Sequence, residues 1–343
     1  MRMAQPTSLA QHDAAQQRGV PPLERVRDDV WALGMSMPGH GLPYSLLYLF
    51  RDADDRFHVL DPGWDSDDNF AALTAAMQEL GTELDRVASV TITHLHPDHI
   101  GMSQRIRAHS RAIVQLHRRE KEALRAHGGT GWSPGLLDPR LENWGAPEDR
   151  RRELQLVADR TPPYPATTID RVLEDDERLD IPGFDVIAMR TPGHTPGHVS
   201  LRDDSRGLLF TGDHLLPMTM GGIGLGGPSE ANALDDYLGG LRSIWPYDDY
   251  EVLPGHGYRF RGLRERIMQT AAHHLARSRE VAAAQRDWPG ESTWQTAERL
   301  TWSRGWDGLA GFFLYSALWQ TDIHGEFVRT GGLERWADFP DVT

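Results

Sequence analysis

Apolar and polar positions alternate along the chain with two periods, and together they predict short strands and helices in turn from about residue 30 to residue 257. Apolar, β-branched runs such as "YSLLYLF" (44–50) and "RVASVTITH" (86–94) are typical of buried strands. In "NFAALTAAMQEL" (69–80) the apolar residues recur three or four positions apart, which predicts an amphipathic helix. Strand and helix patterns that alternate in this way indicate an α/β fold.

Changes in this pattern predict three regions. Residues 1–22 are polar and aperiodic, so we expect a flexible or loosely packed arm. Residues 23–261 form the domain of strands and helices, although residues 128–165, rich in Gly, Pro and Trp, interrupt it as a lid-like insertion. Residues 262–343 are mostly helical in pattern, and we refer to them as the C-terminal cap.

Composition excludes several classes of protein. The 343 residues include no cysteine, which removes disulfides, thiolate nucleophiles and cysteine-ligated metal sites. Lys121 is the only lysine and lies in a charged helical pattern, so Schiff-base and P-loop chemistry are not expected. The formal net charge of −14 weakens the case for a nucleic-acid partner. No apolar run approaches the ~20 residues of a membrane helix and no signal peptide is evident, so we expect a cytoplasmic protein without a membrane partner.

Side chains of the kind that bind metals are concentrated where predicted strands end. They are Asp61 in "VLDPG", His94, His96, Asp98 and His99 in "THLHPDHIG", His194 and His198 in "TPGHTPGHV", Asp213 and His214 in "FTGDH", and His256 in "LPGHG". If these strand ends share one edge of a sheet, the side chains converge there.

The identity and spacing of these residues favour a zinc-like site with two ions. His94 and His96 lie two positions apart, so on an extended segment both can face the same way. An imidazole from a distant loop would complete a three-histidine site with an open position for water. Asp98, His99 and a further histidine could hold a second ion, with Asp213 between the two.

Four motifs carry a resemblance to a known family. They are H-x-H-x-D-H (94–99), TPGHTPGH (191–198), TGDH (211–214) and PGHG (254–257). In this order they resemble the motifs of the metallo-β-lactamase superfamily, closest to its glyoxalase II-like and lactonase-like hydrolases, over roughly residues 28–260. The resemblance implies an αββα sandwich with the site at one edge of its two sheets.

The resemblance also implies a role for each of these residues. It implies site one as His94, His96 and His194, site two as Asp98, His99 and His256, and Asp213 as a ligand bridging both. It implies that Asp61 orients the site from outside the ligand set. We expect His198 and His214 beside the ligands rather than among them, with His198 as the less favoured alternative to His194.

These residues predict a dinuclear metal-dependent hydrolase. Two zinc ions are the favoured cofactor, and iron, manganese or cobalt would also suit the ligands. A hydroxide bridging the ions would attack the carbonyl of an ester, lactone or thioester, while Asp98 and Asp213 hold the metals and the water and accept its proton. A phosphodiesterase or ribonuclease of the same fold is an alternative. A mononuclear iron dioxygenase is less favoured, because the second ligand set is complete.

The remaining expectations concern substrate and partners. The side chains that we expect to line a small-molecule pocket are Tyr44, Trp64, Trp132, Met218 and Tyr237. The C-terminal cap resembles the winged-helix-like caps of some family members. Its apolar helical pattern at residues 307–326 contains no Arg or Lys, which argues against nucleic-acid binding and favours packing on the hydrolase domain or on a second copy of the chain.

Overall fold

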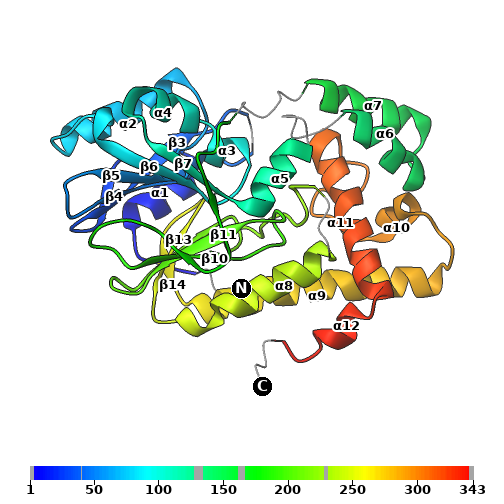
Figure 1. Ribbon diagram of the computed structural model, residues 1–343. Coiled ribbons are helices and arrows are strands. Elements are labelled where there is room, and N and C mark those ends of the chain that lie inside the picture. The colour runs from blue at the N-terminus through cyan, green and yellow to red at the C-terminus, as the bar shows by residue number, and fades with distance from the viewer. Residues whose placement is uncertain (1–3, 40, 127–133, 161–166, 228–230, 340–343) are drawn as a thin grey trace.

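Two seven-stranded sheets pack face to face, with helices on their outer faces (Figure 1). The computed structural model describes residues 4–39, 41–126, 134–160, 167–227 and 231–339. This is the αββα sandwich expected from the sequence, and the predicted mostly helical C-terminal cap follows it.

The strands divide between the sheets largely by their order along the chain. In spatial order, the N-terminal sheet contains β2 (Glu24–Arg27), β3 (Val30–Ser36), β4 (Tyr44–Arg51), β5 (Phe57–Leu60), β6 (Val87–Ile92), β7 (Ile113–His117) and β8 (Arg171–Leu173). The C-terminal sheet contains β1 (Gln5–Pro6), β14 (Phe260–Arg261), β13 (Glu251–Pro254), β12 (Leu208–Gly212), β11 (Val199–Asp203), β10 (Val186–Arg190) and β9 (Glu177–Arg178). Because β5 and β6 are parallel, and β12 and β13 are parallel, the carboxyl ends of each pair lie at one edge.

Helices cover both outer faces of the sandwich (Figure 1). Those that follow strands of the N-terminal sheet are α2 (Asp67–Glu79), α3 (Pro97–Ile100), α4 (Ser103–Ser110) and α5 (Arg118–Ala126), with a 3₁₀ turn η1 (Leu84–Arg86). The C-terminal sheet is covered by α8 (Ala233–Ile244), followed by η2 (Trp245–Tyr247), and by α9 (Leu263–Asp287). The cap continues with α10 (Thr293–Arg299), α11 (Gly311–Arg329) and α12 (Gly332–Arg335).

The apolar run of β4 shows how the core is divided. Its alternate side chains Tyr44, Leu46, Tyr48 and Phe50 belong to the cluster between the two sheets. Leu47 and Leu49 point the other way, into the cluster beneath α2 and α4. A strand whose two faces are both buried is continuously apolar rather than alternating, which is the pattern that the sequence shows.

The expectation of a flexible N-terminal arm is wrong for the described residues. Gln5 of β1 pairs with Arg261 of β14, and α1 (Leu9–Gln17) begins at Ser8, whose hydroxyl accepts a hydrogen bond from the Gln11 amide. The Ser8 hydroxyl also donates to Glu24 Oε2 at 2.6 Å. Ser8 is a local N-cap signal, but Arg261 and Glu24 lie far from their partners in the sequence, so the pattern of residues 1–22 does not reveal these contacts.

The insertion at 128–165 is more regular than its composition indicates. The structure has two helices there, α6 (Pro134–Asn143) and α7 (Glu148–Arg160). They contact the cap: the indole of Trp144 lies 5.9 Å from that of Trp319, and Glu153 Oε1 accepts a hydrogen bond from the Gly311 amide at 2.9 Å. That the insertion acts as a lid stays a prediction.

The C-terminal cap is helical, as expected, but its resemblance to a winged helix is not confirmed in the described part. Residues 326–335 lie at the end of α11 and in α12. Between residues 262 and 339 the described chain contains no strand, so it has no wing.

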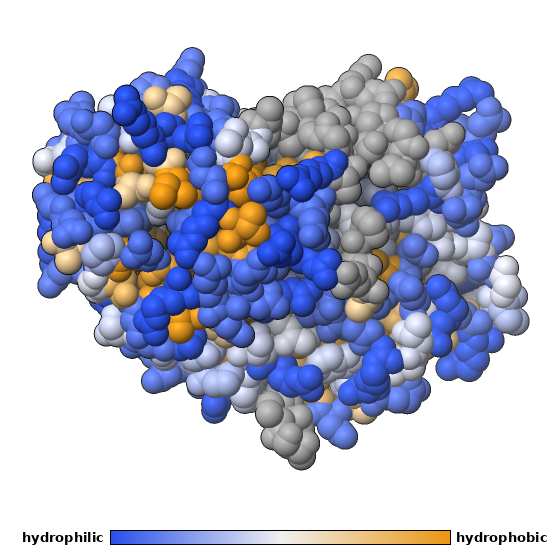
Figure 2. All heavy atoms as spheres, in the orientation of Figure 1, coloured by the Kyte–Doolittle hydropathy of each residue, from blue (hydrophilic) through white to orange (hydrophobic). Residues whose placement is uncertain are grey.

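One face of the molecule is mostly polar. Figure 2 shows a largely hydrophilic face on which apolar residues form small separate groups. None of the helices in the described residues has both the length and the apolar character needed to cross a membrane.

We expect Ser8→Ala to lower the free energy of unfolding by about 1–2 kcal/mol, since it removes a helix N-cap and the hydrogen bond to Glu24. Urea denaturation would measure this change. Leu9→Ala is the control, because Leu9 is 76% exposed and its loss should cost less than about 0.5 kcal/mol. Equal free energies of unfolding for the Ser8→Ala variant and the wild type would instead support the expectation that residues 1–22 form a flexible arm.

Candidate metal centre

The predicted ligands meet at the edge where strands of both sheets end. From the N-terminal sheet, β6 leads into His94 and His96, and the short helix α3 carries Asp98 and His99. The C-terminal sheet contributes His194 from the loop between β10 and β11, Asp213 after β12 and His256 after β13. The seven ligand atoms form two groups, and within each group all atoms lie within 4.8 Å of one another.

Site one is formed by three imidazoles and one carboxylate. His96 Nδ1 lies 2.9 Å from His94 Nε2 and 3.1 Å from His194 Nε2. Asp213 Oδ2 lies 3.7 Å from His194 Nε2. Three nitrogen atoms therefore point at a common position with a carboxylate oxygen beside it.

Site two is formed by Asp98, His99 and His256. Asp98 Oδ2 lies 3.6 Å from His99 Nε2 and 3.1 Å from His256 Nε2. Asp213 Oδ1 lies 3.4 Å from each of these two nitrogens. The two oxygens of Asp213 thus face different sites, which is the arrangement of the bridging ligand that the sequence predicts.

Three of the five predicted ligand histidines are held in orientation by a backbone carbonyl that contacts the ring nitrogen facing away from the site. His194 Nδ1 lies 2.7 Å from Gly222 O, His256 Nδ1 lies 2.6 Å from Tyr44 O, and His96 Nε2 lies 3.2 Å from Leu225 O. A carbonyl oxygen only accepts, so each of these nitrogens carries a proton, and the nitrogen that faces the site is the one that can coordinate a metal once it is deprotonated.

Asp61 supports the ligands without belonging to them. Its Oδ2 accepts from His99 Nδ1 and from the Thr93 hydroxyl, each at 2.8 Å, and its Oδ1 accepts from the Thr93 amide at 2.8 Å. The backbone of Asp61 is left-handed, with φ of 52°. An aspartate held in this less common conformation directs its carboxylate toward His99, which is the role expected from the sequence.

The imidazoles of the two sites differ in their pKa shifts. Burial lowers the pKa of His94 well below its usual value and the pKa of His194 to about 4, so both rings are neutral. Burial alone would also lower the pKa of His256, but the carboxylates of Asp213 and Asp98 outweigh it and raise the pKa to about 10. Likewise burial opposes the charged form of Asp98, yet His99 and His256 outweigh it and lower the pKa to about 2.

These residues fit a pair of divalent ions. Among the described residues, the buried atoms His99 Nε2 and Asp213 Oδ1 have no hydrogen-bond partner. Unpaired buried polar atoms cost free energy, and a cation coordinated by both would satisfy them. Imidazole and carboxylate donors suit zinc and also iron, manganese or cobalt.

His198 and His214 lie beside the ligands, as expected from the sequence. His198 Nδ1 lies 2.9 Å from the Thr191 hydroxyl, and its Nε2 accepts from the Asp213 amide at 3.2 Å. His198 therefore holds the backbone of Asp213, whose carboxylate lies between the two sites. The His214 ring packs 4.7 Å from that of Tyr237, and burial lowers its pKa to about 3.

Two of the five expected substrate residues are corrected by the structure. Tyr44 is buried and donates its hydroxyl to Gly257 O at 2.8 Å, and Tyr237 is buried and donates to His214 O at 2.5 Å. Both phenols are bound to backbone and hold the chain beside the ligands. Trp64 is half-buried and Met218 is exposed, so a substrate role for these two stays a prediction, and Trp132 lies outside the described residues.

One residue close to the site was missed. Glu120 lies in the charged pattern that predicted a solvated helix, yet its side chain is fully buried and accepts hydrogen bonds from Leu95 N and Gly197 N. Glu120 and the partly buried Leu124 are four positions apart, so helical spacing placed both on the inner face.

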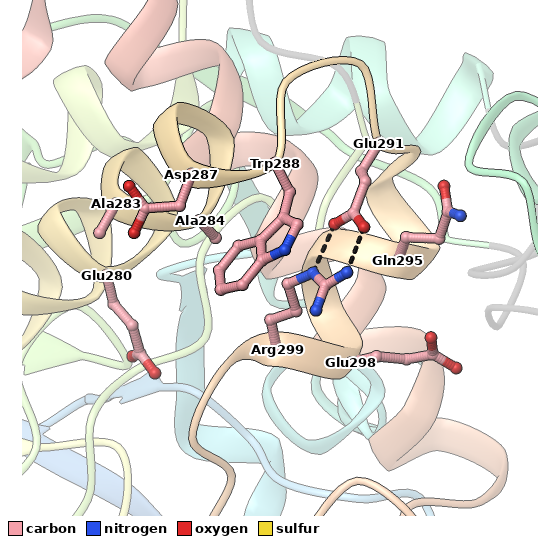
Figure 3. Close-up of a pocket in the computed structure, with 9 residues that line it drawn as sticks. All are labelled: Glu280, Ala283, Ala284, Asp287, Trp288, Glu291, Gln295, Glu298 and Arg299. Atoms are coloured by element: carbon pink, nitrogen blue, oxygen red, sulfur yellow. Dashed lines mark hydrogen bonds and ion pairs between the residues drawn. The ribbon is translucent and has the colours of Figure 1, made fainter.

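A groove of about 520 Å³ between the end of α9 and α10 is far from the ligands along the chain (Figure 3). Glu291 there is ion-paired with Arg299, whose guanidinium lies 4.1 Å from the centre of the Trp288 ring. The charged groups of Glu291 and Arg299 satisfy one another, and none of the predicted ligands lines the groove.

Comparisons with known proteins agree with this geometry. The chain is 23% identical to the probable metallo-hydrolase YqjP of Bacillus subtilis over 62% of this chain and 66% of that protein. It is 26% identical to the hydroxyacylglutathione hydrolase GloC of Haemophilus influenzae over 60% of this chain and 73% of that protein.

Solved structures share the fold. A metallo-β-lactamase family protein from Thermus thermophilus superposes with a TM-score of 0.72 and 24% identity over 90% of this chain and 95% of the other. A β-lactamase domain protein from Burkholderia ambifaria gives the same TM-score and identity over 90% and 89%. A model of the metallo-β-lactamase superfamily matches residues 41–256, which include all seven predicted ligands, and the chain belongs to this superfamily.

Proposed function

We propose that this protein is a dinuclear metal-dependent hydrolase that cleaves an ester, a lactone or a thioester. The observation that carries the proposal is the position of Asp213, with one oxygen toward each of two ligand sets. When bound, two divalent ions would supply Lewis acidity at a substrate oxygen and lower the pKa of a water held between them.

The residues of the chain have distinct parts in this reaction. His94, His96 and His194 are neutral donors, so the carboxylate of Asp213 supplies the negative charge beside the ion of site one. The pKa of Asp98, about 2, keeps its carboxylate ionised, so it can bind a cation and accept a hydrogen bond from the attacking water. Solvent reaches the cluster from the side of His96, which is half-buried.

Partial solvent access favours a catalytic site over a structural one. A structural zinc is closed off by its protein ligands, whereas a catalytic site keeps a position for water or substrate. Here the ring of His96 is half-buried, whereas the other six predicted ligands are buried, so water can approach the pair of sites beside His96. A complete second set also favours two ions over the single iron of a dioxygenase.

The substrate class rests on the relatives and on the ligand chemistry. GloC is named for hydroxyacylglutathione, a thioester, which supports a carbonyl substrate of this kind. We expect a small-molecule substrate and a cytoplasmic location, and we infer that the cap packs on the hydrolase domain rather than on nucleic acid.

Metal-replete protein should contain about two zinc, iron, manganese or cobalt ions per chain, because each of two ligand sets is complete. Elemental analysis against protein concentration would measure the ratio. A ratio that never exceeds one would rule out the dinuclear site.

His194→Ala should remove the ion of site one and nearly all activity, since His194 Nε2 points into that site. His198→Ala is its matched partner and should retain most of the metal, because His198 contacts the Asp213 amide and not the ligand position. Metal analysis of both variants tests the assignment. If His198→Ala lost metal and His194→Ala did not, His198 rather than His194 would be the ligand of site one.

Asp213→Asn should lower turnover by more than about 100-fold, because a neutral amide is a poor bridge between two cations. Asp65→Asn, at an exposed position, is the control and should retain full activity. Hydrolysis of lactones, thioesters, β-lactams and phosphodiesters would be compared. Activity confined to phosphodiesters would replace the proposed substrate class with the nuclease alternative.

A further inference from the structure

Glu120 is a buried carboxylate on a helix whose neighbouring charges are solvated. It lies in α5, where Glu122 is exposed and pairs with Arg119 at 3.3 Å. Glu120 itself has no exposed surface. Burying a carboxylate is costly unless its oxygens are hydrogen-bonded, so its partners indicate why it is there.

Those partners are the two loops that carry the imidazoles of site one. Glu120 Oε2 accepts from Leu95 N at 2.8 Å, and Leu95 lies between the ligands His94 and His96. Glu120 Oε1 accepts from Gly197 N at 2.6 Å, and Gly197 lies three residues after the ligand His194. We call this pair of hydrogen bonds the Glu120 bridge.

Close packing independently supports the bridge. A Cβ atom at Gly197 would lie 2.6 Å from Arg119 Cβ and 2.6 Å from Glu120 N. Only glycine allows the backbone of this loop to lie directly against the start of α5. The glycine in the second half of the TPGHTPGH motif thus has a structural reason that involves Glu120.

The two loops belong to different sheets. Leu95 follows β6 of the N-terminal sheet, whereas Gly197 precedes β11 of the C-terminal sheet. A backbone hydrogen bond from Val199 N to Thr93 O, 3.0 Å long, joins them at the base. The Glu120 bridge joins the same two loops a second time, at Leu95, between the ligands His94 and His96, and at Gly197, three residues after the ligand His194.

We propose that Glu120 is a positioning residue for site one, which holds the loop of His94 and His96 at the distance from His194 that a three-imidazole metal site requires. The inference rests on the proposed binding of metal at site one. It assigns Glu120 no contact with substrate or metal.

The chemistry of the bridge requires a carboxylate. Two backbone N–H groups donate to it, one to each oxygen, and only a carboxylate offers two accepting oxygens in this geometry. Glutamine has nearly the same shape, but its amide nitrogen would face one of the N–H groups as a second donor. Glu120→Gln therefore breaks one half of the bridge with little change in volume.

The test compares zinc binding by the wild type, Glu120→Gln and Glu122→Gln. Each protein is stripped with a chelator and titrated with zinc against a chromophoric competitor. We expect Glu120→Gln to weaken one of the two zinc equivalents about 10–100-fold, as is usual when a group that orients ligands is lost. Glu122→Gln, on the exposed side of the same helix, should bind both equivalents as the wild type does.

Two further measurements separate positioning from a general structural role. The rise in Tm on adding zinc should be smaller for Glu120→Gln than for the wild type, whereas a purely structural role would lower Tm equally with and without zinc. In a His194→Ala background, which already lacks site one, Glu120→Gln should leave the remaining equivalent unchanged. Glu120→Asp, too short to reach both amides, should repeat the effect of Glu120→Gln.

The outcomes that contradict the inference are distinct from those that contradict the function. Unchanged affinity for both equivalents in Glu120→Gln would overturn the positioning role. So would variants at Glu120 that stay unfolded in excess zinc, because Glu120 would then support the whole fold rather than site one. A wild type that binds no zinc would instead overturn the proposed metal site.

Discussion

The shared carboxylate of Asp213 is the constraint on which this edge of the molecule depends. Ligand nitrogens from two sheets lie 3.4–3.7 Å from the oxygens of this one side chain, so the surrounding backbone segments must also lie close together. Gly255 shows the consequence: a Cβ there would lie 2.5 Å from Asp213 Oδ1 and 2.7 Å from His99 Cε1. Gly212, with φ of 46°, would place a Cβ 2.6 Å from His198 Nε2. The glycines of TGDH and PGHG are therefore as necessary as the ligands that they accompany.

The N-terminal segment and site two are connected through the same kind of contact. Tyr44 O accepts from His256 Nδ1, and the Tyr44 hydroxyl donates to Gly257 O, so one residue of β4 holds the His256 loop from two sides. The same hydroxyl lies 3.3 Å from Gln11 O of α1, and Gln11 Oε1 accepts from the Arg259 amide. Residues that looked like an arm in the sequence thus pack directly behind a ligand loop.

The ligands could be predicted from the sequence because each belongs to a short motif at a strand end. The strands β4 and β6 could be predicted because their apolar runs are local.

The features that the sequence did not reveal are of a different kind. The contacts of Ser8 with Glu24 and of Glu120 with Leu95 and Gly197 join segments that are distant in sequence, and the identity of a polar residue does not indicate its partner. Tyr44 and Tyr237 are amphipathic rings that suit a pocket or a core equally well, and only the position of a backbone carbonyl decides between them. Between α3 and α4, a Cβ at Gly101 would lie 2.5 Å from Gly63 O, a close contact that periodicity cannot show.

The C-terminal cap takes part in the metal centre through the loop at residues 221–227. Two carbonyls of this loop, Gly222 O and Leu225 O, orient the site-one ligands His194 and His96. The loop is in turn held by α11: Gln320 Nε2 donates to Ile223 O at 3.2 Å, and Gly224 packs so closely that a Cβ would lie 2.7 Å from Trp319 Nε1. Trp319 also contacts the insertion, through the Trp144 ring and the Arg140 guanidinium, which lies 4.3 Å from the Trp319 ring. A continuous set of contacts therefore joins the insertion, the cap and two ligand histidines, and any movement of α11 relative to the sandwich would change the orientation of the rings that define site one.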